Sequence, residues 1–209
     1  MQPSDIAALV DDRPEEGAFR VDRRVFTDPE IFDLEMTHIF EAGWVFLGLA
    51  SQLPKPNDFL TTTIGRQPVI VMRDKDGALG AFLNSCRHRG ARICRLGQGN
   101  KKLHVCPYHS WSYDSGGRCR AVKNKEHGAY TDAFDQDSHD LAPVARFADY
   151  KGFLFASLSD AVPSFEDYLG QARAFLDCVA DQSPEGVELI PGAVRFTYDG
   201  NWKLQLENC

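Results

Sequence analysis

The sequence lacks the features of a chain that enters or crosses a membrane. None of its apolar runs reaches the length of about 20 residues that a helix needs to span a bilayer. Residues 1–17, MQPSDIAALVDDRPEEG, show no basic start followed by an apolar core, so we expect no secretory signal peptide. These absences predict a cytoplasmic protein with no membrane partner.

Positive charge is also scarce. The chain has 23 Lys and Arg against 30 Asp and Glu, and its formal net charge of −7 argues against nucleic acid as a partner. Apolar residues make up 43% of the 209 residues and charged residues 25%, which is typical of a folded globular domain. The six cysteines, in a chain without a signal peptide, are more often metal ligands or core residues than disulfides.

The first regular element that the sequence predicts is a helix from Pro29 to about Gly43, after a polar N-terminal arm. Thr27 or Asp28 can cap this helix, Pro29 suits its first turn, and Glu30 interacts favourably with the helix dipole.

From Trp44 onward the sequence changes to short stretches rich in β-branched and aromatic residues, which are typical of strands. Asp76-Gly77 suits a hairpin turn between two of these stretches. Segment 123–149 is polar with few regular signals, so we expect a long loop or short turns there. This part of the chain is therefore predicted to be mainly β. The expected strands are 59–65, 68–73, 78–86, 103–106, 111–114, 118–122 and 152–158.

A second helix is expected from Ser164, which has capping-box spacing to Asp167. Residues 194–209 have the texture of a strand, and the chain stops inside that element. We therefore expect the sequence to be part of a longer protein. The predicted buried stripe of the second helix is Leu169, Ala172, Leu176 and Val179.

Two short motifs each supply one thiol and one imidazole. Cys86 and His88 are separated by one residue, and Cys106 and His109 by two, with seventeen residues between the motifs. Nearby glycines and Pro107 allow tight loops, so the two motifs can face each other.

Two metal sites are compatible with these four residues. One is a mononuclear zinc site with two Cys and two His ligands. The other is a [2Fe-2S] cluster in which one iron takes two thiolates and the other two imidazoles, with a reduction potential of roughly −150 to +300 mV. Zinc sites usually pair two cysteines on one turn and two histidines on another, whereas here each motif is mixed. The alternation favours the cluster and leaves zinc as the alternative.

The segments NSCRHRGARIC (84–94) and CPYHSW (106–111) resemble the Rieske motifs C-x-H-R-G and C-P-Y/F-H-x-W of non-haem iron ring-hydroxylating oxygenase large subunits. NWKLQLEN (201–208) resembles the start of their catalytic domain, in which Asn208 would lie close to a mononuclear Fe(II). The iron ligands themselves would lie beyond Cys209. The resemblance implies four metal ligands, Cys86, His88, Cys106 and His109. The other cluster-binding residues that it implies are Arg89, Tyr108 and Trp111.

The resemblance implies a Rieske domain of small antiparallel sheets at 44–158, after an N-terminal arm and helix at 1–43. Residues 159–209 would begin an α+β catalytic domain. The protein would pass electrons from a ferredoxin or a ferredoxin-domain reductase to an iron that activates O₂ for hydroxylation of an aromatic substrate. The texture is most similar to enzymes of benzoate, anthranilate or salicylate type. The implied assembly is a homotrimer or an α₃β₃ complex with a small β subunit. A stand-alone Rieske-type ferredoxin and a zinc-stabilised binding module are the alternatives.

The resemblance is to oxygenases rather than to respiratory Rieske proteins. Respiratory proteins carry a disulfide clamp at the positions occupied here by Ala91 and Tyr108, and a serine that donates to sulfur where this chain has Trp111. Fewer hydrogen bonds to the cluster imply a lower potential. Ser110 stands where many oxygenases have glycine. A positive φ there would strain a serine, but we expect its small side chain to be tolerated.

The region from Gly77 to Tyr113 contains six basic residues and no Asp or Glu. We expect Trp111 and Tyr108 to shield the cluster from water and Arg89 to be structural. The basic residues either steer an acidic redox partner or, as the alternative, pair with carboxylates of the same trimer as structural residues. The six basic residues are Arg87, Arg89, Arg92, Arg95, Lys101 and Lys102. Surface or capping roles are expected for His38, His104, His127 and His139, and buried or incidental roles for Cys94, Cys119, Cys178 and Cys209.

Overall fold

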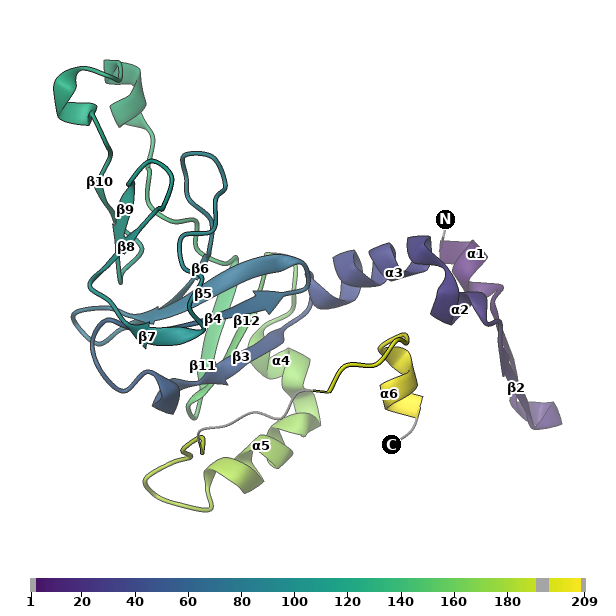
Figure 1. Cartoon of the computed structure of the whole chain (residues 1–209). Helices are drawn as coiled ribbons and strands as arrows, with labels where there is room; N and C mark the ends of the chain where they lie inside the picture. The colour runs from purple at the N-terminus through teal and green to yellow at the C-terminus, as the bar shows by residue number, and fades with distance from the viewer. Residues whose placement is uncertain (1–2, 191–195, 208–209) are drawn as a thin grey trace. The chain divides into compact units, whose positions relative to one another are not determined.

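A computed structural model describes residues 3–190 and 196–207 (Figure 1). The chain divides into two compact units. One comprises residues 40–190, and the other comprises residues 1–39 together with 191–209. In the described part, no helix is long and apolar enough to cross a membrane.

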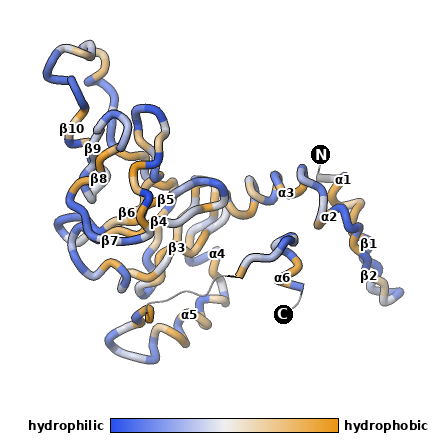
Figure 2. The backbone as a smooth tube through the Cα atoms, in the orientation of Figure 1, coloured by the Kyte–Doolittle hydropathy of each residue, from blue (hydrophilic) through white to orange (hydrophobic). Residues whose placement is uncertain are grey.

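The centre of the larger unit is a four-stranded antiparallel sheet with the order β6-β5-β4-β7. Its strands are β4 (Asp58–Ile64), β5 (Gln67–Arg73), β6 (Leu79–Leu83) and β7 (Gln98–Asn100). Because the tight turn at Asp76-Gly77 joins β5 to β6, the hairpin prediction is confirmed. Figure 2 shows hydrophobic and hydrophilic colours alternating along the tube.

Strand β5 is buried on both faces, which explains its continuous apolar sequence. Val69 and Val71 face a core shared with a three-stranded sheet, β11-β12-β3. Ile70 and Met72 face a second core that contains Cys86. Successive side chains of a strand point to opposite faces, so one strand supports both cores. The strands of the three-stranded sheet are β3 (Val45–Leu49), β11 (Arg146–Tyr150) and β12 (Phe153–Ser157).

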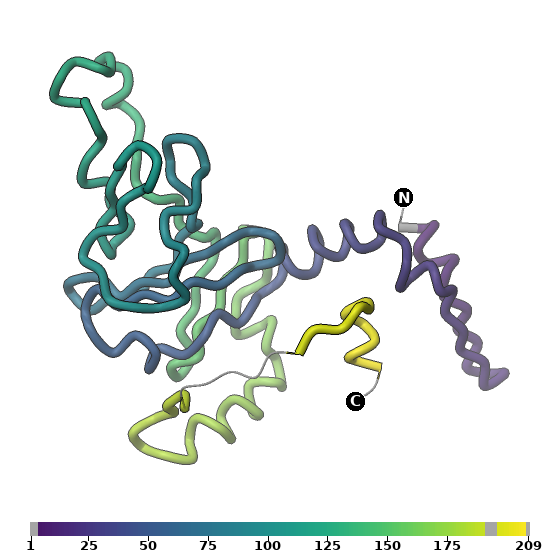
Figure 3. Tube along the Cα trace, in the orientation of Figure 1, coloured from purple at the N-terminus to yellow at the C-terminus, as the bar shows by residue number. Residues whose placement is uncertain are grey.

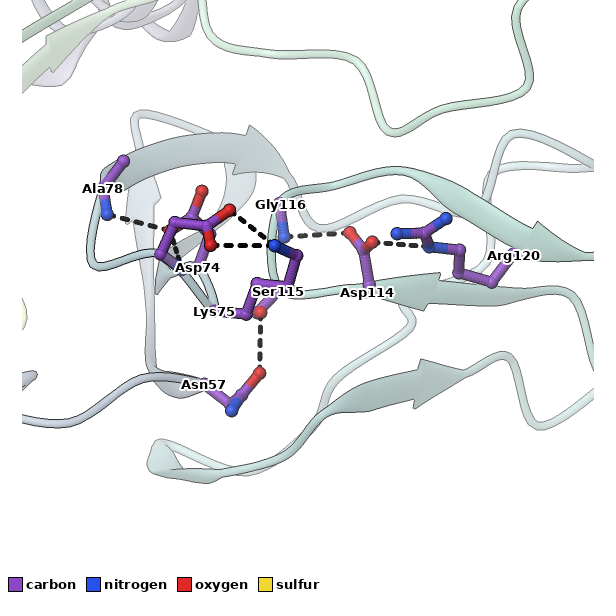
Figure 4. A network of polar contacts seen from close by, with 9 residues as sticks. Asn57, Asp74, Lys75, Ala78, Asp114, Ser115, Gly116 and Arg120 are labelled. Carbon is purple, nitrogen blue, oxygen red and sulfur yellow. Dashed lines mark hydrogen bonds and ion pairs between the residues drawn. The ribbon is translucent and has the colours of Figure 1, made fainter.

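A third sheet, with the order β10-β9-β8, carries the second of the two Cys/His motifs. Its strands are β8 (Leu103–Val105), β9 (Ser112–Asp114) and β10 (Cys119–Ala121). Figure 4 shows how its β9–β10 turn is tied to the chain before β4. The Ser115 hydroxyl donates to Asn57 Oδ1 over 2.9 Å, and Arg120 Nε donates to Asp114 Oδ2 over 2.6 Å.

The predicted long loop or short turns at 123–149 are confirmed for residues 123–145. The helical turns in that segment are the short 3₁₀ turns η4 (Lys125–His127) and η5 (Asp132–Gln136). The rest of that segment is strand β11, and β7 is a further strand that the sequence did not signal. Both strands are short or polar, and their pairing with β12 and β4 defines them. A further 3₁₀ turn, η3, spans Ala50–Gln52.

The second helix is interrupted, which makes half of its predicted stripe wrong. It consists of α4 (Phe165–Leu169), the 3₁₀ turn η6 (Gly170–Ala172) and α5 (Arg173–Ala180), and the predicted Ser164 cap is confirmed. Gly170 adopts φ +48°, so the helical phase changes there. Val179 is consequently 44% exposed and Ala172 is exposed, while Phe165 and Ala180 are buried instead.

The smaller unit contains helices and one hairpin. The predicted helix at Pro29 is confirmed, with Asp28 accepting a hydrogen bond from Glu30 N over 2.8 Å. The polar arm before it is more ordered than expected. The elements are α1 (Pro3–Ala7), β1 (Val10–Arg13), η1 (Pro14–Glu16), β2 (Ala18–Val21), α2 (Arg24–Thr27) and α3 (Pro29–Glu35). A π-helical turn, η2, follows at Met36–Phe40.

The expected strand at 194–209 is wrong in its described part, because Lys203–Glu207 is a helix, α6. Asn201 starts it: its side chain accepts from Lys203 N over 3.1 Å, and its carbonyl accepts from Leu204 N. The alternating Leu204 and Leu206 suggested a strand, but both side chains are exposed. Residues 194–195 and 208–209 lie outside the described residues.

Glu35 joins α3 to this C-terminal segment. Its side chain is buried and accepts from Trp202 Nε1 over 2.8 Å at one oxygen and from Lys203 Nζ at the other. The Lys203 ammonium also lies 5.4 Å from the Trp202 ring centre and 5.6 Å from that of Phe26. A buried carboxylate therefore holds two consecutive residues of a segment more than 160 positions away in sequence.

Replacing Glu35 by Ala should lower the free energy of unfolding of this smaller unit by about 3 kcal/mol, because it leaves the Lys203 charge buried without its partner. Hydrogen exchange of residues 203–207 would measure the effect. Glu15→Ala, an exposed carboxylate of the same unit, is the control. Equal exchange in both variants would contradict the assigned role of Glu35.

Candidate metal centre

Both Cys/His motifs lie in loops closed by the same pair of backbone hydrogen bonds. In the first loop, after β6, Cys86 N donates to Ala91 O and Gly90 N donates to Cys86 O, each over 2.8 Å. The cysteine thus bonds to the residues four and five positions later, and the residue four positions later has a positive φ, +74° at Gly90.

The second loop, between β8 and β9, repeats this pattern. Cys106 N donates to Trp111 O over 2.8 Å, and Ser110 N donates to Cys106 O over 3.1 Å. Ser110 adopts φ +58°, so the strained serine that the sequence raised as a possibility is confirmed. Two loops of the same shape thus present their cysteines and histidines to one space.

That space is a cavity of about 310 Å³. Its lining residues are Cys86, His88, Arg89, Ala91, Cys106, Tyr108 and His109. Both thiols are 3% exposed, whereas His88 is half-buried and His109 is exposed. The two imidazole rings meet edge to face, with ring centroids 4.7 Å apart and planes at 86°. The thiols therefore form the inner end of the site and the imidazoles its outer edge.

The donor set fits a [2Fe-2S] cluster bound by two thiolates and two neutral imidazoles. Burial lowers the pKa of His88, with smaller contributions from His109 and Arg89, so the imidazole is held in the neutral form that binds metal. Burial also raises the pKa of the Cys86 thiol, and the neighbouring Cys106 raises it further. Metal binding therefore has to displace the proton of the Cys86 thiol.

Sequence reasoning missed one residue of this site, Tyr113. The side chain is fully buried, and its hydroxyl lies 3.2 Å from Cys86 Sγ. Arg87 N donates to the same oxygen over 3.0 Å, which leaves the phenolic proton to point at the sulfur. Burial raises the pKa of Tyr113, so the phenol stays protonated. The available signal was its position: Tyr113 lies two residues after Trp111 and so shares its inward face of β9.

Of the two expected shielding residues, Trp111 is buried and stacks on the His88 ring, with centroids 5.0 Å apart and planes at 21°. Tyr108 lines the cavity but is 63% exposed, so it covers only the rim. Its hydroxyl accepts from Arg95 over 3.5 Å. Arg89 also lines the cavity and is exposed.

All six basic residues between Gly77 and Tyr113 are exposed. None of them forms an ion pair with a carboxylate in residues 3–190 or 196–207. Their charges are therefore not neutralised within the described part of the chain.

Among the other histidines, the prediction for His104 is wrong. It is 2% exposed and packs edge-on against Phe59, with ring centroids 4.9 Å apart, because β8 turns Leu103 and Val105 outward instead. Burial lowers the pKa of His104 to about 4. His38 and His127 are exposed, as expected, and His139 is half-buried.

The remaining thiols follow the expectation only broadly. Cys94 is buried, Cys119 is half-buried and Cys178 is exposed. Two predicted positions, Asn208 and Cys209, lie outside the described residues.

Comparison with known proteins decides between the two metal sites. The family described as the Rieske [2Fe-2S] domain matches residues 43–145, which include both loops. This part of the chain is a Rieske [2Fe-2S] domain. The mononuclear zinc reading of the same four residues is thereby replaced by the cluster, and the predicted mainly β Rieske fold is confirmed.

The Rieske domain is of the type found in aromatic-ring dioxygenase large subunits. The chain is 50% identical over 204 residues to toluate 1,2-dioxygenase subunit alpha of Pseudomonas putida, covering 97% of this chain and 45% of that one. It is 47% identical over 205 residues to the anthranilate 1,2-dioxygenase large subunit of Acinetobacter baylyi, covering 97% and 43%. The chain thus spans less than half the length of these relatives.

A solved structure agrees with this assignment. Naphthalene 1,2-dioxygenase from Rhodococcus sp., bound to indole, superposes with a TM-score of 0.81 at 37% identity. The match covers 90% of this chain and 42% of that one.

Replacing Ser110 by Gly should stabilise the Rieske domain by about 1 kcal/mol, because glycine adopts a positive φ without the strain of a β-carbon. Urea denaturation at equal cluster content would measure the change. The matched control is Ser85→Gly. Ser85 lies in a loop and does not have a positive φ, so this substitution should not stabilise the domain. Equal effects of the two substitutions would contradict the strain at Ser110.

Replacing Tyr113 by Phe should lower the reduction potential of the cluster by roughly 50 mV, because a hydrogen bond to sulfur stabilises the more negative reduced state by about 1 kcal/mol. The cluster should still assemble, since the ring that fills the core is retained. A redox titration followed by absorption would measure the shift. An unchanged potential would show that the phenol proton does not reach the sulfur.

Proposed function

We propose that this chain is the electron-transferring N-terminal part of an aromatic ring-hydroxylating oxygenase large subunit. The observation that carries the proposal is the cavity with two buried thiols inside and two imidazoles at its edge. It occurs in a chain that is 50% identical in sequence to a dioxygenase subunit. In this proposal residues 44–158 are the Rieske domain, 1–43 an arm and helix, and 159–209 the start of the catalytic domain. The mononuclear Fe(II) is bound beyond Cys209, with Asn208 near it.

The proposed division of labour follows from burial. When bound, the cluster supplies a one-electron carrier of tunable potential. Cys86 and Cys106 hold its inner side away from water, and Tyr113 donates to one of these sulfurs. His88 and His109 would hold its outer side, where His109 is exposed.

We further propose an aromatic carboxylate as the substrate. The relatives named for toluate, anthranilate and 2-halobenzoate (the last from Burkholderia cepacia) are 45–50% identical to this chain. Those named for benzene, chlorobenzene and biphenyl are 38–40% identical over the same length. The difference supports a carboxylate-bearing ring over an unsubstituted hydrocarbon.

The proposed electron donor is an acidic ferredoxin or a ferredoxin-domain reductase. Near the cluster, Leu103 and Val105 point outward from β8, 48% and 51% exposed, and follow directly on Lys101 and Lys102. An apolar centre with charged residues at its rim is typical of a protein-docking surface. The wider proposal includes a trimer or an α₃β₃ assembly, and a cytoplasmic location in which the thiols stay reduced.

The function is tested with the full-length subunit, its β subunit if present, and chemically reduced cluster. We expect two irons and two sulfides per Rieske domain, an electron paramagnetic resonance spectrum of mixed His/Cys ligation, and a third iron. A single turnover with O₂ should hydroxylate benzoate or toluate and leave benzene unchanged. A reducible cluster without any oxygenated product would favour the stand-alone electron carrier instead.

Reversing the charge of Lys101 and Lys102 to Glu should slow cluster reduction by an acidic ferredoxin at low salt by at least tenfold, because steering depends on complementary charge. Stopped-flow reduction at several salt concentrations would measure this. Arg173→Glu, on α5 of the same unit, should leave the rate and its salt dependence unchanged. Equal salt dependence in both variants would sink the docking surface.

A further inference from the structure

The segment 123–140, between β10 and β11, forms a lobe that extends away from the sheets (Figure 3). Its two 3₁₀ turns are short, and a cavity of about 610 Å³ lies between it and β10. Within the lobe only Tyr130, Phe134 and His139 are not exposed, and all three carry rings. These rings therefore supply the buried contacts of the lobe, beside a hydrogen bond from Cys119 N to Asp140 Oδ1 over 2.7 Å.

The three rings form one stack. Tyr130 and Phe134 lie 4.1 Å apart with planes at 30°, and Phe134 and His139 lie 3.8 Å apart with planes at 27°. His139 Nε2 is also 2.7 Å from the Phe134 carbonyl oxygen, which fixes the imidazole against its neighbour. Such stacks favour a defined relative orientation in addition to the apolar area they bury.

The stack ends on Trp111. The Trp111 indole meets Phe134 and His139 edge-on, with ring centroids 5.8 Å and 5.6 Å away. The same indole stacks on the iron ligand His88, with ring centroids 5.0 Å apart. The lobe therefore reaches the cluster ligand through one intervening side chain.

Trp111 is placed by these rings and not by a polar contact. The side chain is 2% exposed, and its Nε1 has no hydrogen-bond partner in the part of the chain that the structure describes. A buried donor without a partner is unfavourable, because it has lost its hydrogen bonds to water. A tryptophan with an unpaired Nε1 beside a cluster ligand is explained if the stacking of its indole on His88 matters more than a hydrogen bond from Nε1.

We propose that Trp111 is a positioning residue for His88, and that the lobe holds the Trp111 ring against His88 through Phe134 and His139. The inference rests on the proposed function. The two imidazole ligands are then unequal: His88 is half-buried and held in a fixed orientation, while His109 stays exposed. The stack keeps water from the His88 side, which disfavours the more negative reduced cluster and keeps the potential low.

The test compares four variants of the cluster-loaded full-length protein: Trp111→Leu, Phe134→Leu, His139→Leu and Phe175→Leu. The first three should raise the reduction potential and broaden the electron paramagnetic resonance signal of the reduced cluster. The conservative Phe134→Tyr should restore wild-type values. Phe175, on α5, is 77% exposed and belongs neither to the cavity lining nor to the stack, so Phe175→Leu should shift neither property.

A second readout needs no cluster. In the apoprotein, Trp111→Leu should increase hydrogen exchange throughout 123–140, because the lobe loses its anchor, and Phe175→Leu should not. If Trp111→Leu assembles no cluster, Phe134→Leu and His139→Leu decide, because neither residue is a ligand. Unchanged potentials in these two variants, with two irons and two sulfides bound, would overturn the inference. A wild-type protein without that cluster would instead overturn the proposed function.

Discussion

Two backbone hydrogen bonds close each metal-binding loop, and most of the larger unit serves to hold these loops opposite each other. Cys86 and Cys106 both bond to the residues four and five positions later, so the loops have the same shape although their Cys-to-His spacings differ. Four donors from two segments meet only if both loops are rigid and their supporting strands are in register. The first loop follows β6 and the second joins β8 to β9. Strand β5 links both regions through the core that its inner residues Ile70 and Met72 share with the cysteines.

Burial then makes the two sides of the site different. The thiols are in the core, where low polarity would leave their charge unscreened without metal and hydrogen bonds. Tyr113 supplies one such bond from β9, so the absence of a serine at position 111 does not leave Cys86 without a side-chain hydrogen bond. The imidazoles face outward, and only His88 has an aromatic ring stacked flat on it within the described residues. The environment of the cluster is thus set by side chains that are not ligands.

The smaller unit depends on a different constraint. A buried carboxylate at Glu35 would be unfavourable alone, and it is matched by an ammonium and an indole N–H from one short segment. The pairing specifies which residues of the N-terminal and C-terminal segments meet. A charged tie of this kind gives register more than net stability, because desolvation offsets much of the attraction.

The amino-acid sequence was enough to predict four candidate ligands, the [2Fe-2S] cofactor and most strands, and to mark Ser110 as a position where a positive φ would strain a serine. These predictions depend on local spacing, on side-chain alternation and on turn residues, all of which are readable along the chain. The folded structure was needed to reveal the contacts of Tyr113, His104 and Glu35, because each depends on a partner distant in sequence. It also decided where the second helix breaks, since a positive φ at Gly170 shifts the phase of the residues that follow. The stack from Tyr130 to His88 was invisible for the same reason: aromatic residues spread over more than forty positions become neighbours only when the lobe folds back on β9.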